Sequence, residues 1–353
     1  MNKRYQISDV AEILNVTKNK IRFYEKEGLI KPDRDPENNY RYFTSDEILK
    51  LQTILLYRFM NIPLKEIKVI MNKEDKKHLL NHFLKQWEII NDEIQERLLI
   101  RNSLEDIMDT FYQQPDLDSD QYLEKIKSSI QQVQQTYQAK TSWKDRWNFD
   151  DQAERYDQFV LNNPSANNFY KYYDKLLETT YLKATEGMSR DIMVLDIGVG
   201  TANLTKLFLE KDYQVVGLDQ SREMLNVARQ KFPALKLRLG EFLKLPFENN
   251  SFDIIVSTYA LHHLNKEEKG LAIKEMLRVL RKDGRIAIGD LMFESEEKRS
   301  EIYQTLTKQQ IREIEDEYYA NIEHLTQIFD KYNYKLDFEK IDKLCYVIDA
   351  RPE

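Results

Sequence analysis

Two short segments carry residues that could hold the adenosine part of a cofactor. Gly198-Val199-Gly200 follows the apolar run 192–197, and Asp219 ends a second apolar run, 19 positions after Gly200. Glycines at a strand end let the backbone approach a ligand and turn helix N–H groups toward it. A carboxylate at the tip of the neighbouring strand can accept hydrogen bonds from both ribose hydroxyls. These two segments suit a nicotinamide dinucleotide as well as S-adenosylmethionine.

Further segments in the second half of the chain distinguish between these two cofactors. They are an acid–aromatic pair after a glycine, a strand-like run, a turn with two histidines and a basic segment. In this sequence they are Gly240-Glu241-Phe242, 251–257, 259–264 and 277–285. The set resembles the class I methyltransferases, which use S-adenosylmethionine, and the resemblance covers about residues 146–350. It disfavours the dinucleotide.

The resemblance implies a Rossmann-like domain in which Glu241 accepts a hydrogen bond from the adenine amino group and Phe242 lies against the ring. The pattern departs from the family at Ala202, where the glycine-rich loop often has a third glycine. Residues 149–157 resemble the helix that covers the donor in the small-molecule branch of the superfamily, so Tyr156 would face the methionine part; an ordinary core role is the alternative. The predicted donor-binding residues are Asp196, Gly198, Gly200, Thr201, Asp219, Gln220, Glu241, Phe242, Ser257 and Tyr156.

The candidate catalytic residues are Tyr156, His262 and His263. Methyl transfer from a sulfonium needs in-line geometry and a dry pocket more than a strong acid or base. One histidine could act as a base, and a structural role for both is the alternative. Neither an H-E-x-x-H motif nor a ligand cluster in the sequence supports a metal site. The acceptor is expected near the tyrosine-rich range 156–182 and near the range 291–335, whose aromatic side chains could hold a planar or cationic molecule; ordinary helix packing is the alternative for each of them.

Two features argue against a nucleic acid as the methyl acceptor. Enzymes that methylate adenine N6 usually carry Asp/Asn-Pro-Pro-aromatic after the fourth strand, and residues 257–260 are Ser-Thr-Tyr-Ala. Enzymes that methylate cytosine C5 need a Pro-Cys nucleophile, and Cys345 lies far from this segment. We therefore expect a small-molecule acceptor, whose identity the sequence leaves open.

The first 72 residues contain the pattern of a helix-turn-helix. Residues 7–14 predict a short amphipathic helix with Ser8 as its N-cap. Thr17 predicts the N-cap of a second helix, 18–27, which Gly28 ends. Two short helices joined by a tight turn place the second helix in a DNA major groove.

A winged extension is predicted after this pair of helices. Asn38-Asn39 suits a hairpin turn because asparagine tolerates positive φ, and the strand after it would point Arg41 at the DNA backbone. A further helix is predicted from Ser45. The alternative for Tyr24 is a place in the core. The predicted DNA-contacting residues are Lys18, Asn19, Lys20, Arg22, Tyr24, Tyr40, Arg41 and Tyr42.

The segments IRFYEKEGLIKP and NNYRYF resemble the head of the MerR family of transcription regulators. The resemblance covers about residues 3–72 and is specific in order and spacing. It implies a dimer that binds a palindromic promoter on double-stranded DNA and distorts the DNA between the half-sites. A helical module that binds another protein is the alternative.

Residues 73–112 predict one long helix with a heptad-like seam. Steps of three and four join ten positions, of which eight are apolar. Because two arginines interrupt the stripe, we expect a short, imperfect coiled coil that forms a homodimer; packing on its own domain is the alternative. The seam consists of Leu80, Phe83, Trp87, Ile90, Ile94, Arg97, Arg101, Leu104, Met108 and Phe111.

Composition fits several soluble domains in one chain. The 353 residues exceed one typical domain, and 41% hydrophobic with 32% charged residues is a globular composition. No apolar run approaches the roughly 18 residues of a membrane span, no secretion signal is seen, and one cysteine excludes a disulfide framework. We therefore expect a cytoplasmic protein without a membrane partner. The first 72 residues hold 13 Lys+Arg against 10 Asp+Glu, or +3, and since the whole chain carries −7, the rest carries −10. Such a basic head permits DNA binding.

The sequence thus predicts a multidomain protein with an all-α winged helix-turn-helix head, a dimerisation helix and an α/β Rossmann-like class I methyltransferase domain. The predicted function is a promoter-binding regulator that binds S-adenosylmethionine, methylates an unidentified small molecule and releases S-adenosylhomocysteine. A non-catalytic regulator that senses either nucleoside is the alternative. The predicted boundaries are 1–72 for the head, 73–112 for the long helix, 113–145 for a polar linker or helical connector and 146–353 for the methyltransferase domain.

Overall fold

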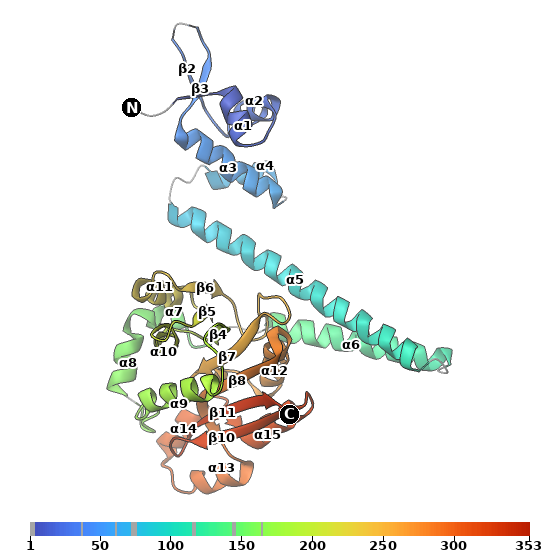
Figure 1. The fold of residues 1–353 in the computed structure, drawn as a ribbon, viewed down its shortest axis with the longest axis vertical. Helices are drawn as coiled ribbons and strands as arrows, with labels where there is room; N and C mark the ends of the chain where they lie inside the picture. Colours follow the sequence, from blue (N-terminus) through green and yellow to red (C-terminus); the bar gives the residue numbers. More distant parts are fainter. Residues whose placement is uncertain are drawn as a thin grey trace. The chain divides into compact units, whose positions relative to one another are not determined.

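The computed structural model divides the chain into two compact units, Met1–Glu93 and Ile94–Glu353 (Figure 1). Pro115 of the predicted connector and the side chain of Leu80 in the predicted seam lie outside the described part. The structure describes residues 4–36, 38–60, 62–71, 76–114, 118–142, 146–163 and 165–353, with only the backbone of 76–82, 84, 88, 132, 139, 141 and 142.

The first unit combines short helices with a small antiparallel sheet of order β1-β3-β2. Its strands are β1 (Tyr5–Gln6), β2 (Asp33–Arg34) and β3 (Arg41–Phe43). Its helices are α1 (Ile7–Ile13), α2 (Lys18–Lys26), α3 (Ser45–Phe59), α4 (Leu64–Met71) and the beginning of α5 (Lys76–Gln113). Ile21, Leu51 and Ile54 are among the fully buried residues of its core. The helix-turn-helix and its wing are therefore present.

Local signals at the ends of these helices were mostly predictable. The Thr17 hydroxyl accepts a hydrogen bond from the Lys20 N–H at 3.2 Å, and Gly28 takes φ +74 after α2, so both predictions are confirmed. The prediction for Ser8 is wrong. The N-cap lies two positions earlier, at Gln6, whose backbone N–H donates to the Asp9 carboxylate at 2.9 Å in a capping box, so Ser8 lies within the first turn of α1.

The second unit is built on a mixed sheet of order β10-β11-β8-β7-β4-β5-β6, with β9 added beside β8. The strands from β8 to β6 along this order pair in parallel, while β11 is antiparallel to both of its neighbours. Helices flank the sheet, so the predicted Rossmann-like α/β class is confirmed (Figure 1). The strands are β4 (Met193–Ile197), β5 (Gln214–Asp219), β6 (Lys236–Leu239), β7 (Phe252–Thr258), β8 (Leu280–Phe293), β9 (Ala320–Asn321), β10 (Tyr334–Lys340) and β11 (Cys345–Pro352).

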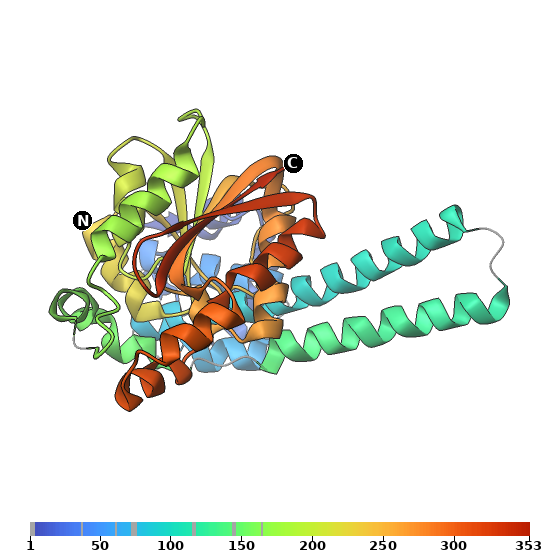
Figure 2. The same cartoon turned by 90° about the horizontal axis from the view of Figure 1, so that it is seen from below.

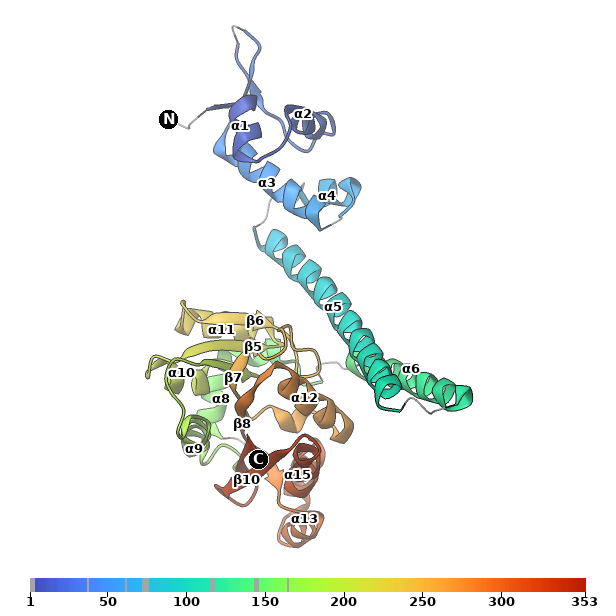
Figure 3. The same ribbon diagram turned by 45° about the vertical axis from the view of Figure 1, so that its right-hand side comes forward.

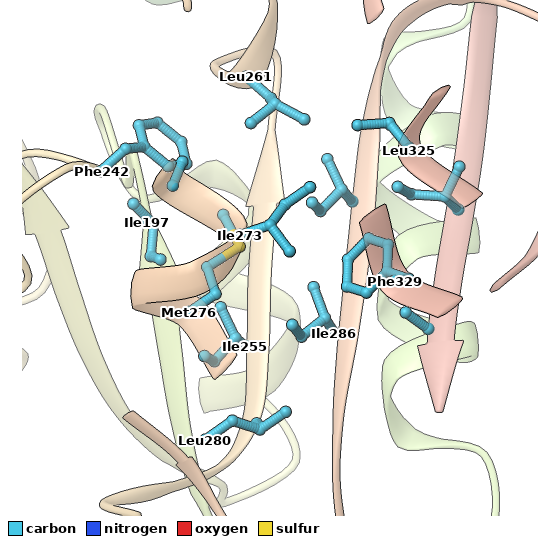
Figure 4. Close-up of a cluster of buried hydrophobic side chains, with 14 of the residues drawn as sticks. Ile197, Phe242, Ile255, Leu261, Ile273, Met276, Leu280, Ile286, Leu325 and Phe329 are labelled. Carbon is cyan, nitrogen blue, oxygen red and sulfur yellow. The ribbon is translucent and has the colours of Figure 1, made fainter. Parts of the chain in front are cut away.

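Two separate apolar clusters hold the helices against the sheet. In one, Ile273 and Met276 of α12 and Phe329 of α15 are fully buried against the strands (Figure 4). In the other, Leu176 of α9 and Phe208 of α10 are equally buried. The central strands are mostly apolar because they are covered on both faces. The helices are α7 (Phe149–Gln152), η1 (Ala153–Arg155), α8 (Tyr156–Asn162), α9 (Tyr173–Thr185), α10 (Asn203–Leu209), α11 (Arg222–Lys231), η2 (Leu261–His263), α12 (Lys266–Val279), α13 (Glu296–Tyr303), α14 (Lys308–Glu315) and α15 (Ile322–Asp330).

A helical hairpin precedes the sheet of the second unit. The end of α5 lies antiparallel to α6 (Ser119–Ser142), as Figures 2 and 3 show, and the rings of Phe111 and Tyr122 stack with centroids 4.0 Å apart. The predicted connector is thus largely one helix. Among the described residues, no helix combines the length and the apolar character that a membrane crossing requires.

Candidate functional site

A pocket lies where the carboxyl ends of β4 and β5 meet the segment from α7 to α8. Ligands of open α/β sheets bind at such strand ends. About 680 Å³ of the space there holds no protein atoms, and part of this space is open to solvent. The lining residues are Phe149, Tyr156, Ile197, Gly198, Gly200, Leu218, Asp219, Gln220, Met224, Gly240, Glu241, Phe242, Leu243, Thr258, Tyr259, Ala260, His263 and Leu264.

At Gly198, the loop after β4 leaves no room for a side chain. Gly198 has φ +72, and a Cβ placed on it would lie 2.6 Å from the Cβ of Ala260. Gly200 also has positive φ, and its N–H donates to Asp219 Oδ2 at 2.8 Å. The backbone can therefore border the pocket directly, as the two glycines predicted.

Asp219 joins the loops that follow β4 and β5. Its Oδ1 accepts from the Ser221 N–H at 2.8 Å, while its Oδ2 accepts from Gly200. The side chain lies in the pocket wall with the residue 8% exposed. Its carboxylate is thereby fixed in orientation before any ligand arrives.

The helical segment before β4 is tied to these same loops. Asp150 Oδ1 accepts from the Ser221 hydroxyl at 2.6 Å, and Asp157 Oδ1 accepts from the Thr201 hydroxyl at 2.6 Å. Tyr156 lies between these two acids in sequence and lines the pocket. Burial and the neighbouring Tyr170 raise the pKa of Tyr156 well above its usual value, so its hydroxyl stays protonated. Through Phe149 and Tyr156 the segment contributes to the pocket wall.

Three of the predicted donor-binding residues support the pocket without lining it. Asp196 is 1% exposed and accepts from the Thr205 hydroxyl at 2.6 Å, and burial raises its pKa to about 7. The Thr201 hydroxyl donates to Asp157. Ser257 is fully buried, and its hydroxyl has no hydrogen-bond partner in the part of the chain that is described. Six of the others line the pocket beside Tyr156: Gly198, Gly200, Asp219, Gln220, Glu241 and Phe242.

The two histidines occupy different places. His262 is buried, with Nδ1 2.5 Å from Asp290 Oδ1. Burial lowers the pKa of His262, but Asp290 and Glu317 together raise it by more, so the pKa lies above its usual value. His263 lines the pocket, with Nδ1 3.1 Å from Glu317 Oε2 and its ring 4.3 Å from that of Trp147. Burial, followed by the nearby His262, lowers the pKa of His263. The second histidine is therefore the better placed base.

Sequence reasoning missed the residues that surround these histidines. Glu317 lies 54 positions after His263, and Asp290 lies 28 positions after His262, so no local motif joins them. Tyr259 was part of the family-like run but was not singled out; it lines the pocket and has φ +48. Its unusual backbone at a strand end gives no signal in the sequence.

The same region groups side chains that are able to bind a metal ion, which the sequence did not predict. His262, His263 and Glu317 offer ligand atoms within 4.8 Å of one another. The Nδ1 atoms of both histidines already face carboxylates, Asp290 and Glu317. Each imidazole is thus oriented by an acid, an arrangement that also serves proton transfer.

In the first unit, the exposed face of α2 carries four predicted DNA contacts, Lys18, Asn19, Lys20 and Arg22. Tyr24 is only 2% exposed and lies in the core, so its burial supports the alternative role.

The predicted contacts of the wing have partners within the first unit. Tyr40 is 74% exposed, whereas Arg41 Nε lies 2.7 Å from Glu25 Oε2. The Arg4 guanidinium lies over the Tyr42 ring, 4.3 Å from its centroid. Arg41 can therefore reach DNA only by leaving or sharing this carboxylate.

Known proteins match both units. Residues 195–288 match the family described as methyltransferase domain, and residues 5–74 match the MerR HTH family of regulatory proteins. An uncharacterized methyltransferase from Oceanobacillus iheyensis is 33% identical over 208 residues, which cover 58% of this chain and 95% of that protein. One from Alkaliphilus oremlandii is 35% identical over 208 residues, covering 57% and 94%. The magnesium protoporphyrin IX methyltransferase of Synechocystis, solved with bound S-adenosylhomocysteine, is 13% identical with a TM-score of 0.45, covering 59% and 100%.

The second half of this chain is a methyltransferase of the S-adenosylmethionine-dependent class. The chain belongs to the methyltransferase family of these relatives, and it carries a MerR-type helix-turn-helix domain at its N-terminus. The methyl donor of this class is S-adenosylmethionine.

Proposed function

We propose that this protein is a promoter-binding regulator whose second unit binds S-adenosylmethionine and transfers its methyl group to a small molecule. The observation that carries the proposal is the pocket at the ends of β4 and β5. It combines a wall of backbone at Gly198 with the fixed carboxylate of Asp219. These are the two features that a ribose and its attached sulfonium chain require.

The lining residues divide between the parts of the donor. Asp219 would accept from the ribose hydroxyls, with Gln220 beside it, while Gly198 and Gly200 offer close backbone contact. Glu241 would accept from the adenine amino group, and Phe242, 9% exposed, would lie against the ring. Tyr156 would close over the methionine part. Asp196, Thr201 and Ser257 would support the pocket without lining it.

The first unit would bind promoter DNA through α2 and the wing. Lys18, Lys20 and Arg22 are exposed, and cations on a helix that enters the major groove reach phosphates and base edges. Asn19, Tyr40 and Tyr42 would add polar contacts. We keep the proposed domain boundaries, which are 1–72, 73–112, 113–145 and 146–353.

A homodimer would form through the predicted seam of α5. Ile94, Leu104 and Met108 are 51%, 55% and 53% exposed, although the same helix packs against α6. An apolar stripe of this kind favours a partner helix, and a second copy would match the two half-sites of a palindrome. Light scattering of the purified chain, compared with an Ile94→Glu/Met108→Glu variant, tests this: the wild type is expected at twice the mass of the variant.

A regulator that senses the donor is the second candidate, and specific contacts favour a link between the pocket and α5. The buried side chain of Gln95 donates to the Leu245 carbonyl at 2.9 Å, just after the pocket residues Glu241 and Phe242. Phe83, on the same helix, stacks on Tyr57 in the core of the first unit, with centroids 5.1 Å apart.

A second contact to this loop comes from α6. Lys140 Nζ lies 3.0 Å from Glu275 Oε1, and Glu275 Oε2 accepts from the Leu245 N–H. Both long helices therefore hold the loop that lines the donor pocket. If the loop shifts when the donor binds, α5 and α6 can transmit the shift away from the pocket. Coupling requires that the donor-free and donor-bound proteins differ in their affinity for DNA.

A gel shift on the protein's own promoter, without ligand, with S-adenosylmethionine and with S-adenosylhomocysteine, tests the regulatory proposal. We expect DNA affinity to change with occupancy in the wild type and to stay constant in Gln95→Ala. Gln114→Ala, an exposed glutamine later on the chain, is the control. DNA affinity that no ligand changes would reject the coupling, and no DNA binding at all would reject the regulator.

A further inference from the structure

A second cavity adjoins the donor pocket on the side of α14. Phe149, Tyr156, Tyr259 and His263 line both spaces, so the two are separated only by shared side chains. About 1240 Å³ of the space there holds no protein atoms, compared with 680 Å³ in the donor pocket, and in both cases part of this space is open to solvent. We call it the acceptor cavity, and its other lining residues are Trp147, Gln152, Phe159, Ser165, Phe169, Tyr170, His262, Leu291, Glu313, Asp316 and Glu317.

The lining of the acceptor cavity combines aromatic rings with carboxylates. Seven of its residues are Phe, Tyr or Trp, and three are acids, while its described lining contains neither lysine nor arginine. The rings of Tyr170 and Tyr259 lie 5.2 Å apart, and Trp147 lies beside His263. Aromatic faces and carboxylates both attract cations, and carboxylates repel anions.

The three acids differ in their contacts and their exposure. Glu313 accepts from the N–H of Ala166 at 3.0 Å and from the Ser165 hydroxyl at 2.9 Å, so it holds the wall together. Asp316 is exposed at the rim. Glu317 faces His263, with Oε2 3.1 Å from Nδ1. Only the last acid is directly joined to a residue that also lines the donor pocket.

We propose that the acceptor cavity binds an amine carried on an aromatic or other apolar group, and that His263 accepts the proton that the amine must lose to become methylated. This proposal rests on the proposed methyl transfer and names its substrate class. The aromatic lining would enclose the apolar group, and the acids would draw the ammonium form into the cavity.

The chemistry of the step fixes what His263 has to do. An ammonium has no free electron pair, so its proton must leave before nitrogen can attack. The nitrogen lone pair then forms the new C–N bond, while the electrons of the broken C–S bond return to sulfur and yield a neutral thioether. The proton taken from nitrogen resides on His263 until solvent removes it.

The position of His263 suits this role. A carboxylate only accepts hydrogen bonds, so in the neutral ring Nδ1 carries the hydrogen toward Glu317 and Nε2 keeps its lone pair. The titratable groups near His263 are His262 of η2, Asp290 of β8 and Glu317 from the segment after α14.

Binding of three matched probes tests the charge preference. Phenethylamine, phenethyl alcohol and phenylacetate share a ring and a similar length but carry positive, zero and negative charge. In calorimetry on the full chain saturated with S-adenosylhomocysteine, the amine should bind at least about ten-fold more tightly than the alcohol, and phenylacetate most weakly. Equal or reversed affinities, or no binding of the amine, would overturn the proposal.

A pair of neighbouring acids provides the matched variants. Glu317→Gln should weaken amine binding about ten-fold and leave binding of the alcohol unchanged, because only the charge is removed. Glu315→Gln, on an exposed residue outside the cavity lining, should change neither. If both variants behave alike, the assignment to Glu317 is rejected. Zinc that binds as tightly as the amine, and only with Glu317 intact, would instead identify a metal site and overturn the proposal.

The role of His263 needs a separate readout. His263→Ala should lower kcat for the amine by about a hundred-fold and abolish the fall of kcat at acid pH, while the amine still binds. An unchanged kcat and acid limb would reject the base. Affinity for S-adenosylhomocysteine is measured first on the wild type and on each variant, so that failure of the proposed function can be told from failure of this inference. A wild type that does not bind S-adenosylhomocysteine refutes the proposed function. Normal binding of S-adenosylhomocysteine without a preference for the amine refutes only this inference.

Discussion

The donor pocket and the acceptor cavity share a wall but are built in different ways. On the donor side, two neighbouring strand ends form much of the surface: the Gly198 N–H donates to the Leu218 carbonyl, and the Gly200 N–H donates to the Asp219 carboxylate. On the acceptor side, side chains converge from segments as distant as Trp147 and Glu317. The donor side therefore depends on local backbone shape, and the acceptor side depends on side-chain chemistry.

The largest effect is expected from Gly198→Ala, which tests whether the donor side depends on backbone shape. The added methyl group meets Ala260 at 2.6 Å on a backbone with φ +72. Strain and overpacking together should cost about 3 kcal/mol, seen as loss of donor binding and a lower Tm. Thermal melting with and without S-adenosylhomocysteine measures both. The control is Gly270→Ala in α12, where no atom lies within 4 Å of an added Cβ, and its Tm should equal or slightly exceed that of the wild type.

Asp219→Ala should come next, because it removes the one charge that the donor side contributes from β5. We expect donor affinity to fall by about 2 kcal/mol, near thirty-fold, through loss of charge-assisted hydrogen bonds. Equilibrium dialysis with labelled S-adenosylmethionine gives the affinity. Asp191→Ala, an exposed aspartate, should bind like the wild type. Unchanged affinity in Asp219→Ala would remove the ribose assignment.

The pH dependence of turnover should sharpen the contrast between the two sides. Because burial and His262 lower the pKa of His263 below 6.5, the base is neutral at pH 7 and becomes protonated only at a lower pH. The rate should thus be flat near neutrality and fall about ten-fold per pH unit below the lowered pKa. Initial rates at saturating substrates provide the profile. A rate that rises on acidification contradicts a neutral base.

The smallest effect is expected at Ala202, which has φ +68 where glycine is favoured. Ala202→Gly relieves the left-handed backbone but loosens the unfolded chain, so the net gain in unfolding free energy should be below about 1 kcal/mol. Urea denaturation is sensitive enough to detect it. A clear loss of stability would show that the methyl group of Ala202, which is fully buried, contributes more through packing than it costs in strain.

The same contrast, between local backbone shape and side chains from distant segments, explains which parts of the structure could be predicted from the sequence. The order of apolar runs predicted the sheet, and Gly198 and Asp219 were expected at neighbouring strand ends, where they lie, because these features recur at fixed short spacing. Phe169 and Leu291 fall in the ranges 156–182 and 291–335, near which the sequence predicted the acceptor, but their meeting in one cavity could not be predicted, since only the fold brings these distant segments together. For Tyr24 the helix pattern allowed either a DNA contact or a place in the core, and its burial supports the place in the core.

Pairing between side chains was equally hidden. Arg41 was expected to face DNA, and its ion pair with Glu25 joins residues 16 positions apart on different elements. Gln95, in the long helix, bonds a carbonyl 150 positions away. Neither contact follows a periodic pattern, so the link from α5 to the donor loop could be found only in the folded chain.

The central claim is that the ends of β4 and β5 hold an adenosyl sulfonium nucleoside. Calorimetric titration of the full chain with S-adenosylhomocysteine, and in parallel with NAD, tests it most directly. We predict saturable binding of S-adenosylhomocysteine at one site per chain and no heat from NAD. Binding of NAD in its place, or no binding of S-adenosylhomocysteine to folded protein, would contradict the account.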